Sequence, residues 1–246
     1  MNERQGVKHI GSYIWRRDRL GILFTLLFAV YMGAVIGPNM NAVWDADMDG
    51  EAVTPFLKGI TDWLYLTMFP VYGMVMNKSA MGMWRDDHYS KRLAHWRTMP
   101  IPLASIVQGR YLQMALTLPV IGTVFLFLQY LIASGLREAV TPVQWVENGI
   151  VWMCYSFAAN ALYIWFELGF SGRKYVQFYM GYMILMAVIV TIFTWQGIHL
   201  FQEAIGVIDK GYGLILIAVA AIAAIVATRI GYRATINRIK ERSMTF

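Results

Sequence analysis

Six long apolar stretches constrain the fold of this 246-residue chain more than any other feature of its sequence. The hydrocarbon core of a bilayer is about 30 Å thick, so a helix that crosses it needs about 20 apolar residues. Only helices and closed β-barrels satisfy all their backbone hydrogen bonds inside a bilayer, and these stretches are continuous rather than alternating. The sequence therefore predicts an all-α integral membrane protein with six transmembrane helices, at about 20–38, 61–83, 106–133, 149–170, 176–196 and 212–230.

The composition agrees with this class. Hydrophobic residues make up 58% of the chain and charged residues 15%, whereas soluble proteins have about 45–50% and about 25%. The single cysteine, Cys154, excludes an intrachain disulfide and any site built from several cysteines. No linker separates two domains, so we predict one transmembrane domain over 1–246. Despite the net charge of +6, this composition argues against a nucleic-acid-binding protein.

The uneven distribution of basic residues predicts the orientation. Of the 21 lysines and arginines, 18 lie in the N-terminal segment, the connection between the second and third spans with its flanks, the short connection after the fourth span, and the C-terminal tail. Cytoplasmic segments carry an excess of Lys and Arg. Both termini and these two connections are therefore predicted to be cytoplasmic, in a multi-pass protein of the plasma membrane. The net charge is then a topology signal, with some affinity for the lipid bilayer through anionic headgroups.

Two cytoplasmic segments outside the spans have helical patterns. In the N-terminal segment 7–19, apolar and basic residues alternate at the spacing of an amphipathic helix on the inner leaflet; the alternative is a basic flank that only fixes topology. In the loop 84–105, Tyr89, Leu93 and Trp96 share one face of a short helix. We expect no part of the chain to cover this apolar stripe, so it should lie on the membrane or in the groove of a partner.

Few polar residues lie within the predicted spans. Glu167 is the only acid there, and an intramembrane carboxylate is a candidate for function by default. The alternative is an interface residue ion-paired with the nearby Arg173 and Lys174. Asn160 lies deeper and is expected to hydrogen-bond a neighbouring helix. In addition, Pro70 is expected to kink the second span.

A glycine pair in the first span, Gly33-x-x-x-Gly37, predicts a face for close helix contact.

Motifs for chemistry are missing from the sequence. A phosphate-binding loop ends in Gly-Lys-Ser/Thr, and the chain has no Gly-Lys pair. The acidic run 45–51 has the spacing of the first half of a calcium loop, but Phe56 stands where the bidentate glutamate belongs, so a solvated loop is preferred. We therefore expect that the chain by itself is not an enzyme and binds no metal or cofactor.

The stretch 96–112, WRTMPIPLASIVQGRYL, resembles a segment of the ATP-binding-cassette (ABC) type 2 permease family. In that family, Leu/Trp-Arg-Ser/Thr, a hydrophobic residue, Pro and another hydrophobic residue are followed by small residues and by Gly-Lys/Arg. This segment leads from the second span into the third. The length of the chain, its six predicted spans, its cytoplasmic termini and its amphipathic N-terminal segment agree with the same family.

The resemblance implies a transmembrane subunit, usually of an exporter, that pairs with a second permease subunit as a homodimer or heterodimer. Each permease subunit docks on a separate nucleotide-binding ATPase subunit, which would bind the ATP and Mg²⁺. The loop 84–105 would carry the coupling helix that fits a groove of this ATPase. The residues carried over to it are Arg85, Asp86, Tyr89, Arg92, Leu93, Trp96 and Arg97, with Arg173 and Lys174 as a second cytoplasmic contact.

The sequence thus leads to the hypothesis of an ABC permease that exports a hydrophobic or amphipathic substrate such as a peptide, drug or lipid. One alternative is a stand-alone secondary transporter. Such proteins usually have charged midplane residues or paired discontinuous spans, which the sequence does not indicate. Another alternative is a membrane subunit for signalling or assembly that transports nothing.

Overall fold

The structure, a computed structural model, describes residues 3–44, 53–76, 84 and 87–242. Helices account for nearly all of this part of the chain, and no strand occurs in it, which confirms the all-α prediction. The helical elements are α1 (Glu3–Trp44), α2 (Val53–Thr67), the 3₁₀ helix η1 (Phe69–Gly73), α5 (His88–Thr98), α6 (Leu103–Ile132), α7 (Ser134–Ala139), α8 (Pro142–Gly169), α9 (Gly172–Trp195), α10 (Leu200–Val207), the π-helical turn η2 (Ile208–Tyr212) and α11 (Gly213–Glu241).

Among the described residues, five helical segments are long and apolar enough to cross a membrane. They coincide with the first, third, fourth, fifth and sixth predicted spans. The segments are Gln5–Asn41, Leu103–Ile132, Pro142–Gly169, Gly172–Trp195 and Leu200–Glu241, of which the last runs through α10, η2 and α11. The length and composition of these helices are compatible with a multi-pass membrane protein.

The second predicted span, 61–83, is not one continuous helix, and the interruption is stronger than the expected kink at Pro70. Helix α2 ends at Thr67, and the tighter turn η1 follows it. Proline has no N–H group, so Pro70 cannot donate to the carbonyl of Leu66, four residues earlier. The predicted kink is thus a full break, and residues 77–83 of the predicted span lie outside the described part of the chain.

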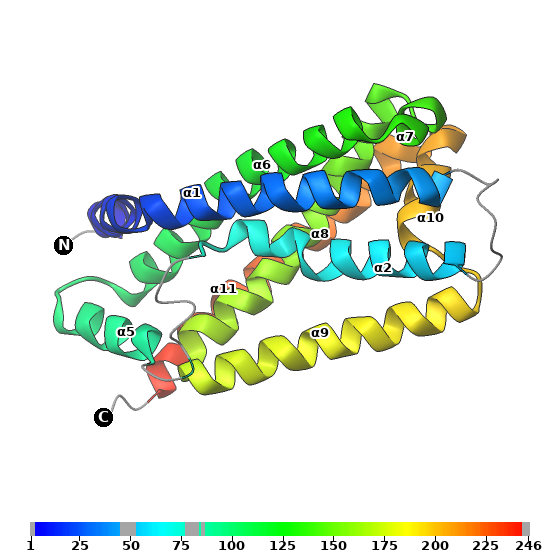
Figure 1. Cartoon of the computed structure of the whole chain (residues 1–246). Helices are drawn as coiled ribbons and strands as arrows, with labels where there is room; N and C mark the ends of the chain where they lie inside the picture. The colour runs from blue at the N-terminus through cyan, green and yellow to red at the C-terminus, as the bar shows by residue number, and fades with distance from the viewer. Residues whose placement is uncertain (1–2, 45–52, 77–83, 85–86, 243–246) are drawn as a thin grey trace.

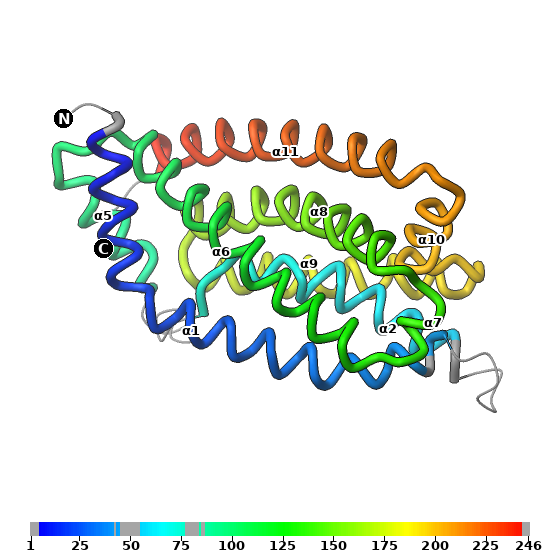
Figure 2. The backbone as a smooth tube through the Cα atoms, turned by 90° about the horizontal axis from the view of Figure 1, so that it is seen from above, coloured from blue at the N-terminus to red at the C-terminus, as the bar shows by residue number. Residues whose placement is uncertain are grey.

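Two pairs of helices form most of the bundle: α1 lies along α6, and α8 lies along α11 (Figures 1 and 2). Gly33 and Gly37 face α6, which confirms the predicted close contact. A Cβ atom at Gly37 would lie 2.9 Å from the Ile132 side chain, and one at Gly33 would lie 3.2 Å from Leu128. Only glycine permits α1 to approach α6 this closely.

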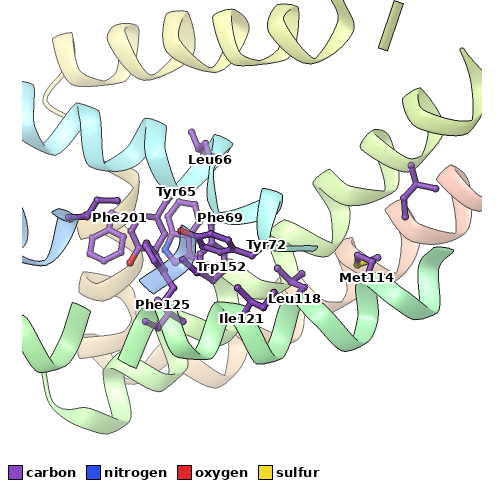
Figure 3. Packing of buried hydrophobic residues seen from close by; sticks show 14 of the residues in the cluster. Tyr65, Leu66, Phe69, Tyr72, Met114, Leu118, Ile121, Phe125, Trp152 and Phe201 are labelled. Carbon is purple, nitrogen blue, oxygen red and sulfur yellow. The ribbon is translucent and has the colours of Figure 1, made fainter. Parts of the chain in front are cut away.

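An aromatic core fills the space between these helices and the broken α2 (Figure 3). Tyr65 lies at its centre, fully buried, with its ring 4.7 Å from that of Phe201 and 5.0 Å from that of Trp152. Phe69 stacks on the other side of Tyr65 at 5.7 Å. Offset and edge contacts at these distances are favourable for aromatic pairs, so this cluster holds α2 and η1 against α6, α8 and α10.

The N-terminal end of α1 and the C-terminal end of α11 lie at the same end of the bundle as α5, whereas α7 and α10 lie at the opposite end (Figure 1). In Figure 2 the first part of α1 runs across the end of the bundle before the helix turns along it. The predicted helix over 7–19 is thus present, but it also packs on the protein itself. Ile10 and Ile14 are buried, and Ile10 lies against Gly109 of α6.

Candidate functional site

Helix α5 begins with a polar cap that connects it to two other helices. The Asp87 carboxylate accepts hydrogen bonds from the backbone N–H (3.3 Å) and the hydroxyl (2.7 Å) of Ser90, and from the N–H of Gly172 (2.8 Å) at the start of α9. Asp87 itself has a positive φ of 39°, which aspartate tolerates because its short side chain bonds locally. One carboxylate therefore caps α5 and holds it to α9.

The end of α11 reaches the same cap. The guanidinium of Arg242 donates to the hydroxyl of Ser90 and to the carbonyl of Leu168 at 3.2 Å. Burial lowers the pKa of Arg242, and the negative charge of Asp87 opposes that shift. Since arginine stays charged at any physiological pH, this contact is a permanent connection between α5, α8 and α11.

The apolar stripe of α5 is covered by the chain itself, which corrects the expectation that nothing in the chain could cover it. Tyr89, Leu93 and Trp96 are all buried. The Tyr89 ring lies 6.0 Å from that of Tyr175 in α9, and the Trp96 ring lies 6.3 Å from that of Tyr13 in α1. Because these side chains are occupied within the chain, they do not form the surface that a partner would meet.

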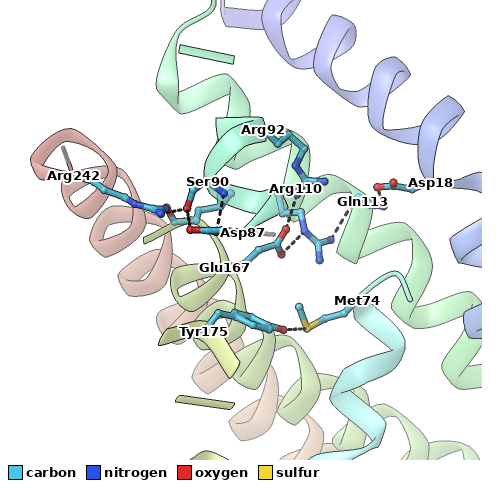
Figure 4. A network of polar contacts seen from close by, with 11 residues as sticks. Asp18, Met74, Asp87, Ser90, Arg92, Arg110, Gln113, Glu167, Tyr175 and Arg242 are labelled. Carbon is cyan, nitrogen blue, oxygen red and sulfur yellow. Dashed lines mark hydrogen bonds and ion pairs between the residues drawn. The ribbon is translucent and has the colours of Figure 1, made fainter. Parts of the chain in front are cut away.

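Glu167 joins α5 to the membrane helices through two buried ion pairs (Figure 4). One carboxylate oxygen accepts from Arg92 of α5 at 2.8 Å, and the other accepts from Arg110 of α6 at 2.9 Å. The Glu167 side chain is 1% exposed. The prediction of an ion-paired residue is therefore right, but the predicted partners, Arg173 and Lys174, are wrong. Both are exposed at the start of α9.

The network continues from α6 to α1. Arg110 donates to the side-chain carbonyl of Gln113 at 3.0 Å, and the Gln113 amide donates to the Asp18 carboxylate at 3.4 Å. The two arginines, Arg92 and Arg110, are thus balanced by the two carboxylates of Glu167 and Asp18. Buried charges are tolerated when they are paired and hydrogen-bonded in this way.

Three members of this network, Asp18, Arg110 and Gln113, were not among the residues proposed from the sequence. Asp18 and Arg110 lie at the edges of predicted spans and counted toward the charge distribution, and Arg110 also belongs to the segment 96–112 that resembles type 2 permeases. A signal was present, since Arg110 and Gln113 lie one turn apart on the same face of α6. Their partner on α8 could not be identified without the tertiary structure.

The face of α5 that remains exposed is polar and basic. It carries Lys91, His95 and Arg97. Arg97 donates to the backbone carbonyl of Arg242 at 3.0 Å, and Arg173 of α9 donates to the carbonyl of Trp84 at 3.3 Å. The remaining predicted coupling residues, Arg85 and Asp86, lie outside the described residues, as does the acidic run 45–51.

The break after α2 is stabilised by neutral side chains from other helices. The carbonyl of Leu66, which has no helical donor, accepts from the hydroxyls of Tyr155 (2.9 Å) and Tyr182 (3.0 Å). The amide of Asn160 donates to the carbonyl of Pro70 at 2.8 Å. The prediction that Asn160 hydrogen-bonds a neighbouring segment is confirmed, and that segment is the broken one.

The polar groups of this site are used in contacts between helices. Within the described residues, no group of three His, Cys, Asp or Glu side chains could hold a metal ion. Both oxygens of Glu167 are already bound by arginine, so this carboxylate is not placed as a general base. Polar contacts connect a single short helix, α5, directly to α8, α9 and α11, and through Glu167 of α8 to α6.

Comparisons with protein-family models, with curated proteins and with solved structures found no match for this chain.

Proposed function

We propose that this chain is the membrane permease subunit of an ABC transporter that exports a hydrophobic or amphipathic substrate such as a peptide, drug or lipid. A separate ATPase subunit binds ATP and Mg²⁺ and hydrolyses the nucleotide, so the chain is not an enzyme by itself. The observation that carries the proposal is the attachment of α5 to three other helices, α8, α9 and α11, while its basic face stays exposed. The resemblance of the segment 96–112 to type 2 permeases supports it.

A coupling element must move the membrane helices when it is itself moved. Helix α5 meets this requirement, because Arg92 and Asp87 hold it to α8 and α9 while the Ser90 hydroxyl holds it to α11. Packed and ion-paired elements change position together, since a close-packed interior does not deform continuously. A push on α5 by the ATPase subunit therefore shifts the inner ends of these helices.

The surface of α5 also indicates what the partner presents. Its exposed side chains, Lys91, His95 and Arg97, are basic or become so on protonation, and the apolar stripe faces inward. An ATPase groove that receives this helix is therefore acidic, and charge complementarity guides the encounter. In this proposal Arg173 and Lys174, which are exposed beside the start of α5, form the second contact.

The proposal includes the topology predicted from the charges. Both termini and α5 are cytoplasmic in the plasma membrane, and the segment that begins with α2 and η1 makes the sixth crossing. The exposed faces of α9 and α11 are aliphatic, with Ile184 and Ile222 more than half exposed, and are available to lipid or to a second permease subunit.

Copurification tests the proposal. The tagged chain is coexpressed with candidate ATPase subunits from the same genome, and the amount of ATPase retained per permease is measured. The double change Lys91→Glu/His95→Glu reverses the charge of the exposed face of α5 and should reduce the retained ATPase at least tenfold. The control Lys240→Glu/His9→Glu makes the same changes at exposed positions at the same end of the molecule and should retain it. Failure of the unmodified chain to bind any ATPase subunit would contradict the proposal.

A stand-alone secondary transporter is a second candidate, favoured by one observation. The break between α2 and η1 resembles the discontinuous helices that form solute sites in such carriers, and Glu167 is a buried intramembrane acid. Proteoliposomes that hold the purified chain without an ATPase distinguish the two functions. Accumulation of a fluorescent amphipathic dye under a proton or sodium gradient alone would favour the carrier.

A further inference from the structure

Two adjoining depressions lie where α11 meets α6 and α8. The first, of about 430 Å³, is formed by α6 and α11. Most of its lining surface is apolar, but all the residues that line it carry a polar group, and we call it the polar end: Gln108, Tyr111, Thr228, Arg229, Tyr232 and Arg233. The second, of about 420 Å³, is formed by α8 and α11, and its apolar lining includes Phe157, Ala221 and Ile225. Thr228 and Arg229 line both, so the two depressions adjoin along α11, and we refer to them together as the groove.

The polar end of this groove carries two positive charges that nothing described in the chain neutralises. Arg229 and Arg233 are exposed and lie four residues apart, on one face of α11. No described acidic side chain forms an ion pair with either of them. This distinguishes them from Arg92 and Arg110, which both form ion pairs with Glu167 inside the protein.

The wall behind these arginines is fixed by contacts between α6 and α11. The Gln108 amide donates to the Tyr232 hydroxyl at 3.1 Å, and the rings of Tyr111 and Tyr232 meet edge to face at 6.1 Å. The polar end is therefore a preformed surface that presents amide and hydroxyl groups beside the two arginines.

The dimensions of the groove match one leaflet of a bilayer. A helix rises about 1.5 Å per residue, so Ala221 at the apolar end lies about 12 Å along α11 from Arg229. Half of a hydrocarbon core of about 30 Å is about 15 Å. The apolar part therefore extends from near the bilayer centre to the level where lipid headgroups begin.

We propose that this groove binds an anionic phospholipid, with the phosphate on Arg229 and Arg233 and one acyl chain along Phe157, Ala221 and Ile225. Basic pockets between membrane helices on the cytoplasmic side recognise anionic headgroups. The inference depends on the orientation that places the basic end of α11 in the cytoplasm, and it goes beyond the proposed transport function. The groove is a lipid site on the outer surface of the α8–α11 pair, away from Glu167 and α5.

The headgroup end is tested by titrating the purified full-length chain, in detergent, with phosphatidylglycerol and with phosphatidylcholine of the same acyl chains. Native mass spectrometry measures the bound fraction. We expect tighter binding of phosphatidylglycerol, and a loss of about thirtyfold in Arg229→Gln/Arg233→Gln, because each basic side chain contributes a little over about fivefold. The control Arg19→Gln/Lys240→Gln removes the same charge at exposed positions outside the groove and should change affinity less than twofold.

The acyl end is tested with a matched pair of bulky substitutions. Ala221→Trp fills the apolar part of the groove and should weaken binding of long-chain phosphatidylglycerol about tenfold, whereas Ala223→Trp lies exposed on another face of α11 and should not. Glycerol phosphate without acyl chains should bind far more weakly than the lipid. Equal binding of the two lipids, equal losses in the groove and control variants, or equal affinity for glycerol phosphate and the lipid would each overturn the proposal.

Discussion

The chain buries polar groups in two different ways. Charged side chains form ion pairs around Glu167, whereas neutral side chains hydrogen-bond the backbone at the break after α2. At the end of the bundle where α5 lies, Glu167 is bound by Arg92 and Arg110, so three helices, α5, α6 and α8, depend on full charges. At the break after α2, neutral hydroxyls and an amide satisfy two carbonyls. One of these carbonyls, that of Leu66, has two donors.

The difference follows from the cost of burying each kind of group. A neutral carbonyl without a partner costs little compared with an unpaired charge, so the break needs only local hydrogen bonds. A paired charge is different, because removing one partner leaves the other buried and uncompensated. The ion pairs of Glu167 therefore fix α5 in one position, whereas the break after α2 tolerates the loss of one hydrogen-bond donor.

The largest effect is expected for Glu167→Ala. The change leaves two arginines buried without their carboxylate and should lower the free energy of unfolding by about 3–5 kcal/mol. Steric trapping in bicelles measures this quantity. Glu203→Ala, at an exposed acid of α10, is the control and should change it by less than about 0.5 kcal/mol. A loss of unfolding free energy for Glu167→Ala as small as that of the control would show that the ion pairs do not stabilise the contact between α5, α6 and α8.

Arg92→Leu should have a smaller and more local effect. Glu167 keeps Arg110, so the expected loss is about 1.5–3 kcal/mol, in the range of a single hydrogen bond to a charged group. Amide hydrogen exchange should become faster in 88–98 and stay unchanged in the α2 break. Lys91→Leu, the adjacent exposed position, should leave exchange in α5 unchanged. Faster exchange in both variants would mean that Arg92 is not the anchor.

At the break, Asn160→Ala should lower the free energy of unfolding by only about 1–2 kcal/mol, because it removes a neutral donor from the Pro70 carbonyl. The same steric-trapping measurement applies, with the exposed Asn237→Ala as its control. A loss as large as that of Glu167→Ala would remove the contrast between the two regions.

The smallest effect is expected for Tyr155→Phe, about 0.5 kcal/mol, since the Leu66 carbonyl keeps the Tyr182 hydroxyl. The double change Tyr155→Phe/Tyr182→Phe leaves this carbonyl without either donor and should cost more than the sum of the single changes. Additive losses measured in a double-mutant cycle would show that the two hydroxyls do not substitute for each other.

The sequence predicted the helical class and five of the crossing segments because long apolar runs depend on local composition alone. It missed the break after α2, since Pro70 ends the helix only together with Tyr155, Tyr182 and Asn160, which come from other parts of the chain. The prediction for the apolar stripe of α5 was wrong for the same reason, because Tyr13 and Tyr175 pack on it through tertiary contacts.

Glu167 illustrates the same limit within the candidate site. Its position as an intramembrane acid was visible in the sequence, and so was its need for a positive partner. The nearest basic residues along the chain, Arg173 and Lys174, were the wrong choice, because the fold brings Arg92 and Arg110 closer. Proximity in sequence does not identify ion-pair partners in a bundle whose helices cross the whole membrane.

Helix α5 turns its basic face outward, toward the proposed ATPase subunit, and its apolar stripe toward the rest of the chain. Site-specific photocrosslinking tests this orientation. Azidophenylalanine is incorporated at the exposed His95 or at the buried Tyr89 in cells that also express a candidate ATPase subunit. The account predicts crosslinks from position 95 to the ATPase subunit, and from position 89 only to the α9 segment around Tyr175. Crosslinks to the ATPase subunit from position 89 and none from position 95 would contradict it.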